Sequence, residues 1–199
     1  MNFLQKLFQI HQLAIKGRAG DVGILKLDLF RLKGAPFWEE SILQLPQIYP
    51  PIELEKLKDY PDNTLGKELY NFMIKGKISP FKISDEFQHL IPKNAFGVRM
   101  LAMHDIYHVL LGFNTSYAGE MGVWAFQRHK KFSSGITISY FAAKILYPLF
   151  SPMTLKNILL ANKEGRRLAR ESILDICFPY EENWNNNLAE VRKKLNITL

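Results

Sequence analysis

Arg99-Met-Leu-Ala-Met-His-Asp-Ile-Tyr-His-Val-Leu-Leu-Gly112 is the most informative segment of this sequence. Its apolar residues recur at spacings of three and four, which is the period of an α-helix. We predict a long helix from about Asn94 to Leu111 that stops at Gly112, because glycine readily adopts the left-handed conformation that ends helices. The next helix is predicted to start near Ser116 and to carry Glu120.

The same helical spacing recurs along the rest of the chain, while strict alternation of apolar and polar residues is scarce. Residues 32–51 contain four prolines and are predicted to form loops and short turns. We expect further helices from about 62 to Gly76, over 136–150, from Ser151-Pro152 to about Cys177, and over 187–195. The chain is therefore predicted to be all-α, with an amphipathic segment at residues 1–20 and a single helical domain at residues 21–199.

The composition fits one folded domain and excludes several classes of protein. The chain has 199 residues, of which 47% are hydrophobic, so it can bury a sizeable core and is too apolar for wholesale disorder. Its single cysteine, Cys177, cannot form an internal disulfide or supply a zinc finger. This cysteine usage is typical of a reducing compartment.

The charge balance indicates an acidic partner, such as anionic lipid headgroups. Lys and Arg number 26 against 19 Asp and Glu, which gives a formal net charge of +7, and residues 1–20 contain no acid. The most apolar stretch, residues 132–155, is interrupted by Pro148 and Pro152, so it does not qualify as a spanning helix of about 20 apolar residues. We therefore expect peripheral association with an anionic membrane surface.

Four residues in and after the first segment have the chemistry of a metal site. His104 and His108 stand four residues apart, so on a helix they lie about 40° apart around the axis and one turn apart along it. Asp105 lies about 100° from His104, where it can join the edge of the site or orient a ligand histidine. Glu120 approaches from the next helix, folded back against the first.

The alternative is that His104 and His108 are hydrogen-bonded histidines that bind no metal. The neighbouring Asp105 and Glu120 favour a metal, because burying such groups without a ligand is costly. Two imidazoles and two carboxylates suit one divalent ion, with zinc first and iron or manganese next, whereas magnesium prefers oxygen ligands and is less well served.

His104-Asp105-Ile-Tyr-His108, followed after eleven residues by Glu120, resembles the HDxxH(x11)E signature of the Coq4 family of coenzyme Q (ubiquinone) biosynthesis. Upstream, residues 63–73 (NTLGKELYNFM) are similar to the family's TLG…Y.FM segment. Downstream, Gly165-Arg166 and residues 184–197 resemble its C-terminal W…L.E.R..L.I ending. Three matches in the same order are more specific than the metal motif alone.

The resemblance implies an α-helical fold, a metal held by His104, Asp105, His108 and Glu120, and a polyprenyl lipid whose head lies at the metal. The prenyl tail is expected in an apolar channel between the helix 94–111 and the helices that follow it. Arginines suit a carboxylate or phosphate head, and large aromatic side chains suit a prenyl channel. The expected substrate contacts are accordingly Arg99, Arg166, Tyr117 and Trp124.

For function, the resemblance implies ubiquinone biosynthesis. We favour a metal-dependent carboxy-lyase that acts in oxidative decarboxylation of a polyprenylated hydroxybenzoate, and we keep a non-catalytic prenyl-lipid-binding scaffold as the alternative. Other quinone-biosynthesis proteins are the expected partners. The expected location is the cytoplasmic membrane face or, in a eukaryote, the matrix side of the mitochondrial inner membrane.

Two other interpretations are weaker. A phosphohydrolase of the HD type needs an upstream histidine and a downstream aspartate; His89 and Asp175 are present, but nothing around them supports that role. Nucleic-acid binding would rest on net charge alone, so no nucleic acid is expected as a partner. A homodimer is expected from the general frequency of such assemblies.

Overall fold

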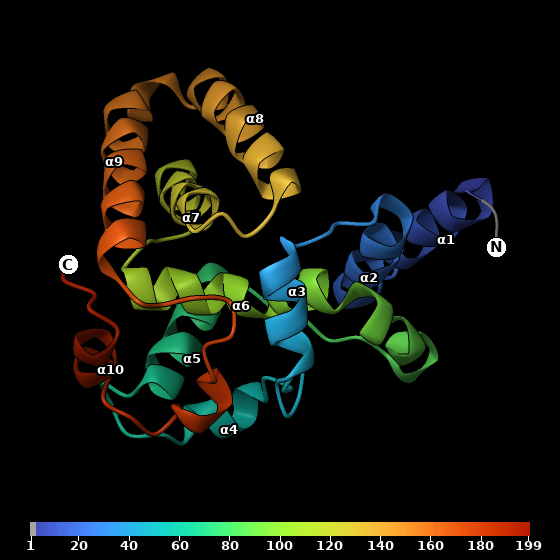
Figure 1. Cartoon of the computed structure of the whole chain (residues 1–199), viewed down its shortest axis with the longest axis horizontal. Coiled ribbons are helices and arrows are strands. Elements are labelled where there is room, and N and C mark those ends of the chain that lie inside the picture. The colour runs from blue at the N-terminus through green and yellow to red at the C-terminus, as the bar shows by residue number, and fades with distance from the viewer. Residues whose placement is uncertain (1–2) are drawn as a thin grey trace.

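The fold is described by a computed structural model in which residues 3–199 are placed (Figure 1). The part of the chain that is described contains ten α-helices, and its β pairing is limited to an isolated bridge between Thr64 and Asn187. The helices are α1 (Phe3–Ile15), α2 (Ala19–Phe30), α3 (Pro36–Leu43), α4 (Leu54–Lys58), α5 (Leu65–Gly76), α6 (Ala95–Leu111), α7 (Tyr117–His129), α8 (Ser134–Phe150), α9 (Leu155–Glu171) and α10 (Leu188–Lys194). The prediction of an all-α protein is confirmed.

Short 3-10 segments join some of these helices: η1 (Asp85–Leu90), η2 (Pro92–Asn94), η3 (Pro152–Thr154) and η4 (Tyr180–Glu182). No helix among residues 3–199 combines the length and the hydropathy that crossing a bilayer requires.

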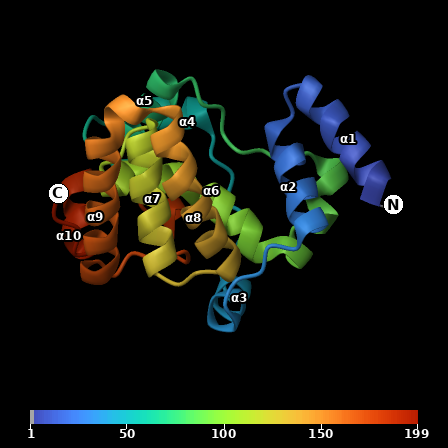
Figure 2. The same cartoon turned by 90° about the horizontal axis from the view of Figure 1, so that it is seen from above.

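Helix α6 lies in the middle of the molecule in both views, with α1 and α2 at one end and α9 and α10 at the other (Figures 1 and 2). Helices α8 and α9 meet at η3 and diverge from there, and α7 lies between them (Figure 1). The contact of α9 with α7 is very close, because a Cβ atom at Gly165 would lie 2.1 Å from the backbone oxygen of Gly122. Gly165 therefore brings α9 against the helix that carries Glu120.

The turn between α6 and α7 follows the sequence prediction. Gly112 has a φ of 72°, in the left-handed region, and the N–H of Phe113 donates to the carbonyl of His108 at 2.9 Å. Ser116 caps α7, because its hydroxyl accepts a hydrogen bond from the N–H of Gly119 at 3.3 Å. The predicted ends of both helices at this turn are confirmed, and the turn folds α7 back beside α6.

The other side of α6 is held by the C-terminal part of the chain. Arg99 is fully buried about 180° around the helix from His108. Its Nε donates to the carbonyl of Ile176 at 3.0 Å and its Nη2 to that of Phe178 at 2.5 Å, while its guanidinium lies 4.6 Å from the centre of the Tyr180 ring. The carboxylate of Glu181, 3.9 Å from Nη2, adds to these contacts in compensating the buried positive charge, while Nη1 has no hydrogen-bond partner among the described residues.

One predicted loop region contains a helix. Residues 36–43 form α3, with Pro36 in its first turn, where the missing N–H of proline costs no hydrogen bond. Prolines commonly indicate loops, but Pro36 marks the start of a helix. This part of the prediction is wrong.

The helix predicted from Ser151 to about Cys177 is shorter at both ends. Ser151 and Pro152 lead into the 3-10 turn η3, the Ser151 hydroxyl accepts from the Thr154 hydroxyl at 2.8 Å, and α9 begins only at Leu155. After Glu171 the chain becomes extended, and the N–H of Ile173 donates to the carbonyl of Leu195 at 2.9 Å. The N–H of Ile173 thus bonds to the C-terminal segment and not to a carbonyl in a further turn of α9.

Helices α1 and α2 pack against each other, and residue 20, where the sequence suggested a boundary, lies in the first turn of α2. Asp28 is buried and forms ion pairs with Lys6 of α1 and, at 2.6 Å, with Lys93 of η2. The apolar side of α1 is only partly buried: Ile10 is buried, whereas Leu4 and other large side chains at the start of the helix are exposed. The ion pairs of Asp28 and a small cluster of buried apolar side chains together hold α1 and α2 against α6.

We expect Asp28→Asn to lower the free energy of unfolding by about 1–2 kcal/mol at neutral pH. Burial alone would raise the pKa of Asp28, but hydrogen bonds from Lys6, Lys93 and Asn94 lower it to about 2. This stabilisation is present above the unfolded pKa of about 3.9 and is lost as the pH falls towards 2. Urea unfolding of both proteins across this range should therefore converge in acid. The exposed Asp62→Asn is the control, and an equal loss there would contradict the ion-pair explanation.

Candidate metal centre

Three side chains that were predicted to hold a metal come together at the start of α7. One ligand atom from each of His104, His108 and Glu120 lies within 4.8 Å of the other two. Nε2 of His104 is 3.4 Å from Oε2 of Glu120, and Nε2 of His108 is 3.2 Å from Oε1. Both imidazoles come from one side of α6, and the carboxylate comes from the first turn of α7.

His108 is the buried member of this cluster. Its Nδ1 lies 3.3 Å from the carbonyl oxygen of Phe113, so a proton on Nδ1 satisfies both atoms. The ring of Phe72 in α5 stacks on the imidazole at a centroid distance of 5.4 Å and an interplanar angle of 26°. The carbonyl and the stacked ring fix the orientation of His108 and direct Nε2 towards Glu120.

His104 is bracketed by two carboxylates. Its Nδ1 is 3.3 Å from Oδ1 of Asp105, and its Nε2 faces Glu120. Burial works against the charged imidazole, but Asp105 and Glu120 outweigh it and raise the pKa of His104 to about 9. Burial likewise raises the pKa of Glu120, but the two imidazoles next to its carboxylate lower it to about 2 when they are protonated. Asp105 thus touches a candidate ligand on its outer side, where an orienting carboxylate is placed in metal sites.

The donor set fits a divalent metal. With its proton on Nδ1, His108 presents a lone pair on Nε2 to a carboxylate oxygen, and this buried Nε2 has no hydrogen-bond partner among the described residues. Two acceptors in contact repel each other unless a cation lies between them. Two imidazoles and one carboxylate also match the three protein ligands typical of catalytic zinc, which keeps a further position open.

A cavity of about 550 Å³ adjoins the cluster at Glu120. Its walls come from the start of α7, from Tyr147 of α8 and from residues 151–157. The predicted contact Tyr117 lines it, with its ring 5.0 Å from that of Tyr147. Trp124, a second predicted contact, donates from Nε1 to the hydroxyl of Tyr147 at 3.2 Å. Both aromatic residues therefore lie beside the cavity or support its wall.

The two predicted arginine contacts lie elsewhere. Arg99 is on the opposite side of α6, and the exposed Arg166 lies near His129, whose pKa is lowered by burial and by the charges of Arg166 and two other arginines. His129 is at the far end of α7 from Glu120, about 13 Å along the helix axis. The structure thus brings together the metal candidates and the two aromatic contacts, and it does not bring the arginines to them.

The residues that an HD-type phosphohydrolase would need are also outside the cluster. His89 lies in η1, and Asp175 accepts a hydrogen bond from the N–H of Cys177 at 2.7 Å. Neither belongs to the group of three that can share a metal.

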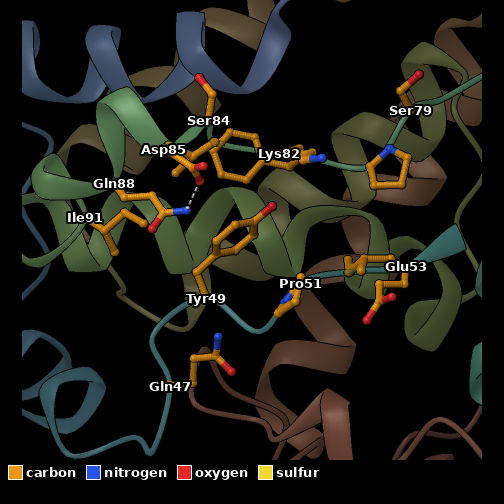
Figure 3. A pocket seen from close by; sticks show the side chains of 14 residues that line it. Gln47, Tyr49, Pro51, Glu53, Ser79, Lys82, Ser84, Asp85, Gln88 and Ile91 are labelled. Carbon is orange, nitrogen blue, oxygen red and sulfur yellow. Dashed lines mark hydrogen bonds between the residues drawn. The ribbon is translucent and has the colours of Figure 1, made fainter.

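A larger cavity, of about 900 Å³, lies away from these residues. It is formed between residues 47–53 and 79–91, and Figure 3 shows Tyr49 and Lys82 among the side chains that line it. None of the metal candidates reaches this cavity, so size alone does not identify the chemical site.

The sequence did not reveal two features of the site. Phe72 was recognised as an apolar residue of a helix, but its stacking on His108 depends on how α5 packs against α6. Ser151 and Thr154 line the cavity at Glu120 only because α8 and α9 fold over the start of α7. No local motif marks either contact.

Known proteins share both the sequence pattern and the fold. The model of a family described as coenzyme Q (ubiquinone) biosynthesis protein Coq4 matches residues 42–199. The mitochondrial ubiquinone biosynthesis protein COQ4 homolog of Mus musculus is 27% identical over 203 residues, covering 93% of this chain and 70% of that protein. The Homo sapiens homolog is 26% identical over 195 residues, with the same coverage of each chain.

A crystal structure of a protein from Nostoc punctiforme, assigned to ubiquinone biosynthesis, superposes with a TM-score of 0.65. The match covers 99% of this chain and 97% of that chain, and at 19% identity it shows a shared fold. The family match itself extends over most of the chain and includes the histidine pair and the glutamate. This chain therefore belongs to the Coq4 family of coenzyme Q (ubiquinone) biosynthesis proteins.

Proposed function

We propose that this chain binds one divalent metal through His104, His108 and Glu120 and holds a polyprenylated hydroxybenzoate with its polar head at that metal. In this proposal it acts in the oxidative decarboxylation of the ring during ubiquinone biosynthesis. The observation that supports it most directly is the buried Nε2 of His108, which faces Glu120 without a hydrogen bond.

Each residue of the site has a distinct task in this proposal. His104, His108 and Glu120 hold the metal, and Asp105 fixes His104 through Nδ1. A bound divalent ion, zinc first and iron, manganese or magnesium as further candidates, supplies a Lewis acid for the carboxylate or phenolic oxygens of the substrate. Tyr117 borders the cavity at Glu120, whose volume of about 550 Å³ is within the usual range of small-molecule sites.

The proposed reaction removes the carboxylate from the aromatic ring. The bond between the ring carbon and the carboxylate breaks, carbon dioxide leaves, and the electron pair remains on the ring carbon. That carbon takes up a proton or, in the oxidative reaction, gains a hydroxyl group whose oxygen comes from dioxygen. In the oxidative case an external reductant supplies two electrons, solvent supplies the protons, and the second oxygen atom leaves as water. The substrate's tail stays in the apolar part of the site throughout.

A non-catalytic scaffold is the second candidate, and one observation favours it. Apart from Glu120, the titratable residues that line the cavity are the two tyrosines Tyr117 and Tyr147, and burial raises the pKa of Tyr147. The lining thus offers no additional group that exchanges protons near neutral pH. In that case the metal would only anchor an anionic head.

Release of labelled carbon dioxide from a carboxyl-labelled prenylated hydroxybenzoate tests the choice. We expect release by the wild-type protein supplied with dioxygen and a reductant, and a loss of at least a hundredfold in His104→Ala, because removing Lewis-acid stabilisation costs several kcal/mol. Lipid binding without any release from the wild type would support the scaffold instead.

Location and partners also belong to this proposal. The relatives from Mus musculus and Homo sapiens are named mitochondrial, and we propose a mitochondrial location on the matrix side of the inner membrane if the host is a eukaryote. Other proteins of quinone biosynthesis and a second copy of the chain are the proposed protein partners. No nucleic acid is proposed.

Peripheral association with anionic membranes should be sensitive to salt. The net charge of +7 gives attraction worth about 1 kcal/mol for each basic residue near the surface, and salt screens it. We expect the protein to float with anionic liposomes at low salt and to be released substantially at high salt. Binding that is indifferent to salt, or absent at low salt, would contradict this expectation.

A further inference from the structure

Helix α8 presents a broad apolar side to solvent. Its buried contacts with the rest of the protein are made by Ile136, Tyr140 and Ala143. On the opposite side, an apolar surface covers about 180° of the helix circumference. This surface, which we call the α8 face, consists of Ile138, Phe141, Ile145, Leu146, Leu149 and Phe150, all of them exposed.

The apolar surface continues beyond the end of α8. Met153 in η3 is 96% exposed, at the point where α8 and α9 meet. Next to it, Leu155, Leu159 and Leu160 of α9 line a groove of about 670 Å³ that also includes Lys156. Exposed apolar patches of this extent on a soluble protein commonly mark an interaction site.

The charged residues of this part of the chain are all basic. Residues 121–163, which include all of α8 and η3, contain six Lys or Arg and no Asp or Glu. They account for six of the seven excess positive charges of the chain. Lys144 lies on α8 and Lys156 beside the groove, and both are exposed. The partner that complements this surface is therefore apolar and negatively charged.

We propose that the α8 face and Met153 form the surface through which this protein docks on an anionic lipid bilayer. Helix α8 is about 25 Å long and contains Pro148, so it would lie in the plane of the headgroups with its apolar side chains below them. Residues 121–163 of a second copy would offer this basic surface no acidic residue, so a symmetric dimer through this face gains no charge complementarity.

The surface borders the proposed site. The ring of Phe150 is 6.2 Å from that of Tyr117, which lines the cavity at Glu120, and Tyr147 of α8 lines the same cavity. A lipid that leaves the bilayer at α8 would therefore reach the cavity directly. The docking rests on the membrane association in the proposed function, whereas it does not depend on the metal site.

A pair of matched double variants tests the docking surface in the full chain. Ile145→Ser with Leu149→Ser removes two side chains of the α8 face that are 66% and 71% exposed. The control, Ile173→Ser with Leu43→Ser, removes the same residue types at 63% and 57% exposure, and neither residue lies in α1, α8, η3 or α9. The probe is flotation with phosphatidylcholine vesicles, with and without phosphatidylglycerol, and circular dichroism with thermal unfolding verifies that both variants remain folded.

We expect wild-type protein to bind the vesicles with phosphatidylglycerol more tightly. The α8 variant should bind them about tenfold or more weakly, because two partly buried large side chains are worth at least that. The control variant should stay within twofold of wild type. Equal binding of the α8 variant and wild type, or an equal loss in the control variant, would overturn the proposal.

Two further measurements separate the remaining outcomes. If the α8 face is instead an interface between copies, light scattering will show that the wild type is an oligomer and that the α8 variant is a monomer. Vesicle binding by the two proteins will then be equal, and the proposal fails. The variant His104→Ala with His108→Ala should keep full vesicle binding, and the α8 variant should keep its metal content. Failure of the metal site would therefore leave the docking result standing.

Discussion

Replacing His104 and His108 together by alanine is expected to abolish metal binding. The wild-type protein should carry about one divalent ion per chain, and the double variant should carry close to none. The reason is that only Glu120 of the three convergent donors would remain, and a single carboxylate holds divalent transition metals weakly. Elemental analysis of the purified, folded proteins measures the difference and identifies the ion.

The matched control replaces His11 and His89, two exposed histidines outside the cluster, by alanine. It removes the same number of imidazoles, so its metal content should equal that of the wild type. Equal metal content in the wild type and the His104, His108 variant would exclude this site. Asp105→Ala should reduce metal content only partly, since Asp105 contacts His104 and is not one of the three convergent donors.

A prenylated hydroxybenzoate is expected to bind at least about a thousandfold more tightly than the same benzoate without its tail. Burial of each methylene is worth about 0.8 kcal/mol, so even about six buried carbons give this factor. Titration calorimetry or fluorescence of Trp124, which lies beside the site, can follow both ligands. Equal affinity of the two ligands for the wild type would remove the prenyl channel from the proposal and leave the metal site.

The same titration in Glu120→Ala separates tail binding from chemistry. If the tail dominates affinity, this variant should bind the prenylated ligand within about tenfold of the wild type while losing carbon dioxide release. A collapse of affinity for the prenylated ligand would show instead that the metal and the head supply most of the binding.

Local sequence signals predicted the part of the fold that positions the metal candidates. Gly112 and Ser116 act through their own backbone and hydroxyl groups, so the end of α6 and the start of α7 could be located from the sequence. The histidine spacing then placed both imidazoles on one side of α6. The approach of Glu120 from the next helix followed from the turn between them.

The remaining features depend on contacts between distant residues. Arg99 was interpreted as a substrate contact, but its side chain donates to the carbonyls of Ile176 and Phe178. No sequence feature near residue 99 indicates these two partners. The end of α9 was not apparent from the sequence either, because Ile173, Leu174 and Ile176 are all apolar and suggest a longer helix. Only the structure shows that Leu174 and Ile176 are buried while Ile173 is exposed.

The interactions of α6 with the end of the chain have a consequence for the order of folding. Arg99 finds its carbonyl partners 77 and 79 residues later, and Arg192 donates to the carbonyls of Leu110 and Val109 from 82 and 83 residues away. During synthesis, the histidines and Glu120 emerge long before these partners exist, so a nascent α6 carries a cation that would be buried without compensation. The helix that holds the metal candidates should therefore reach its final packing only after residues 176–192 have emerged, and a metal encountered earlier would meet an incomplete site.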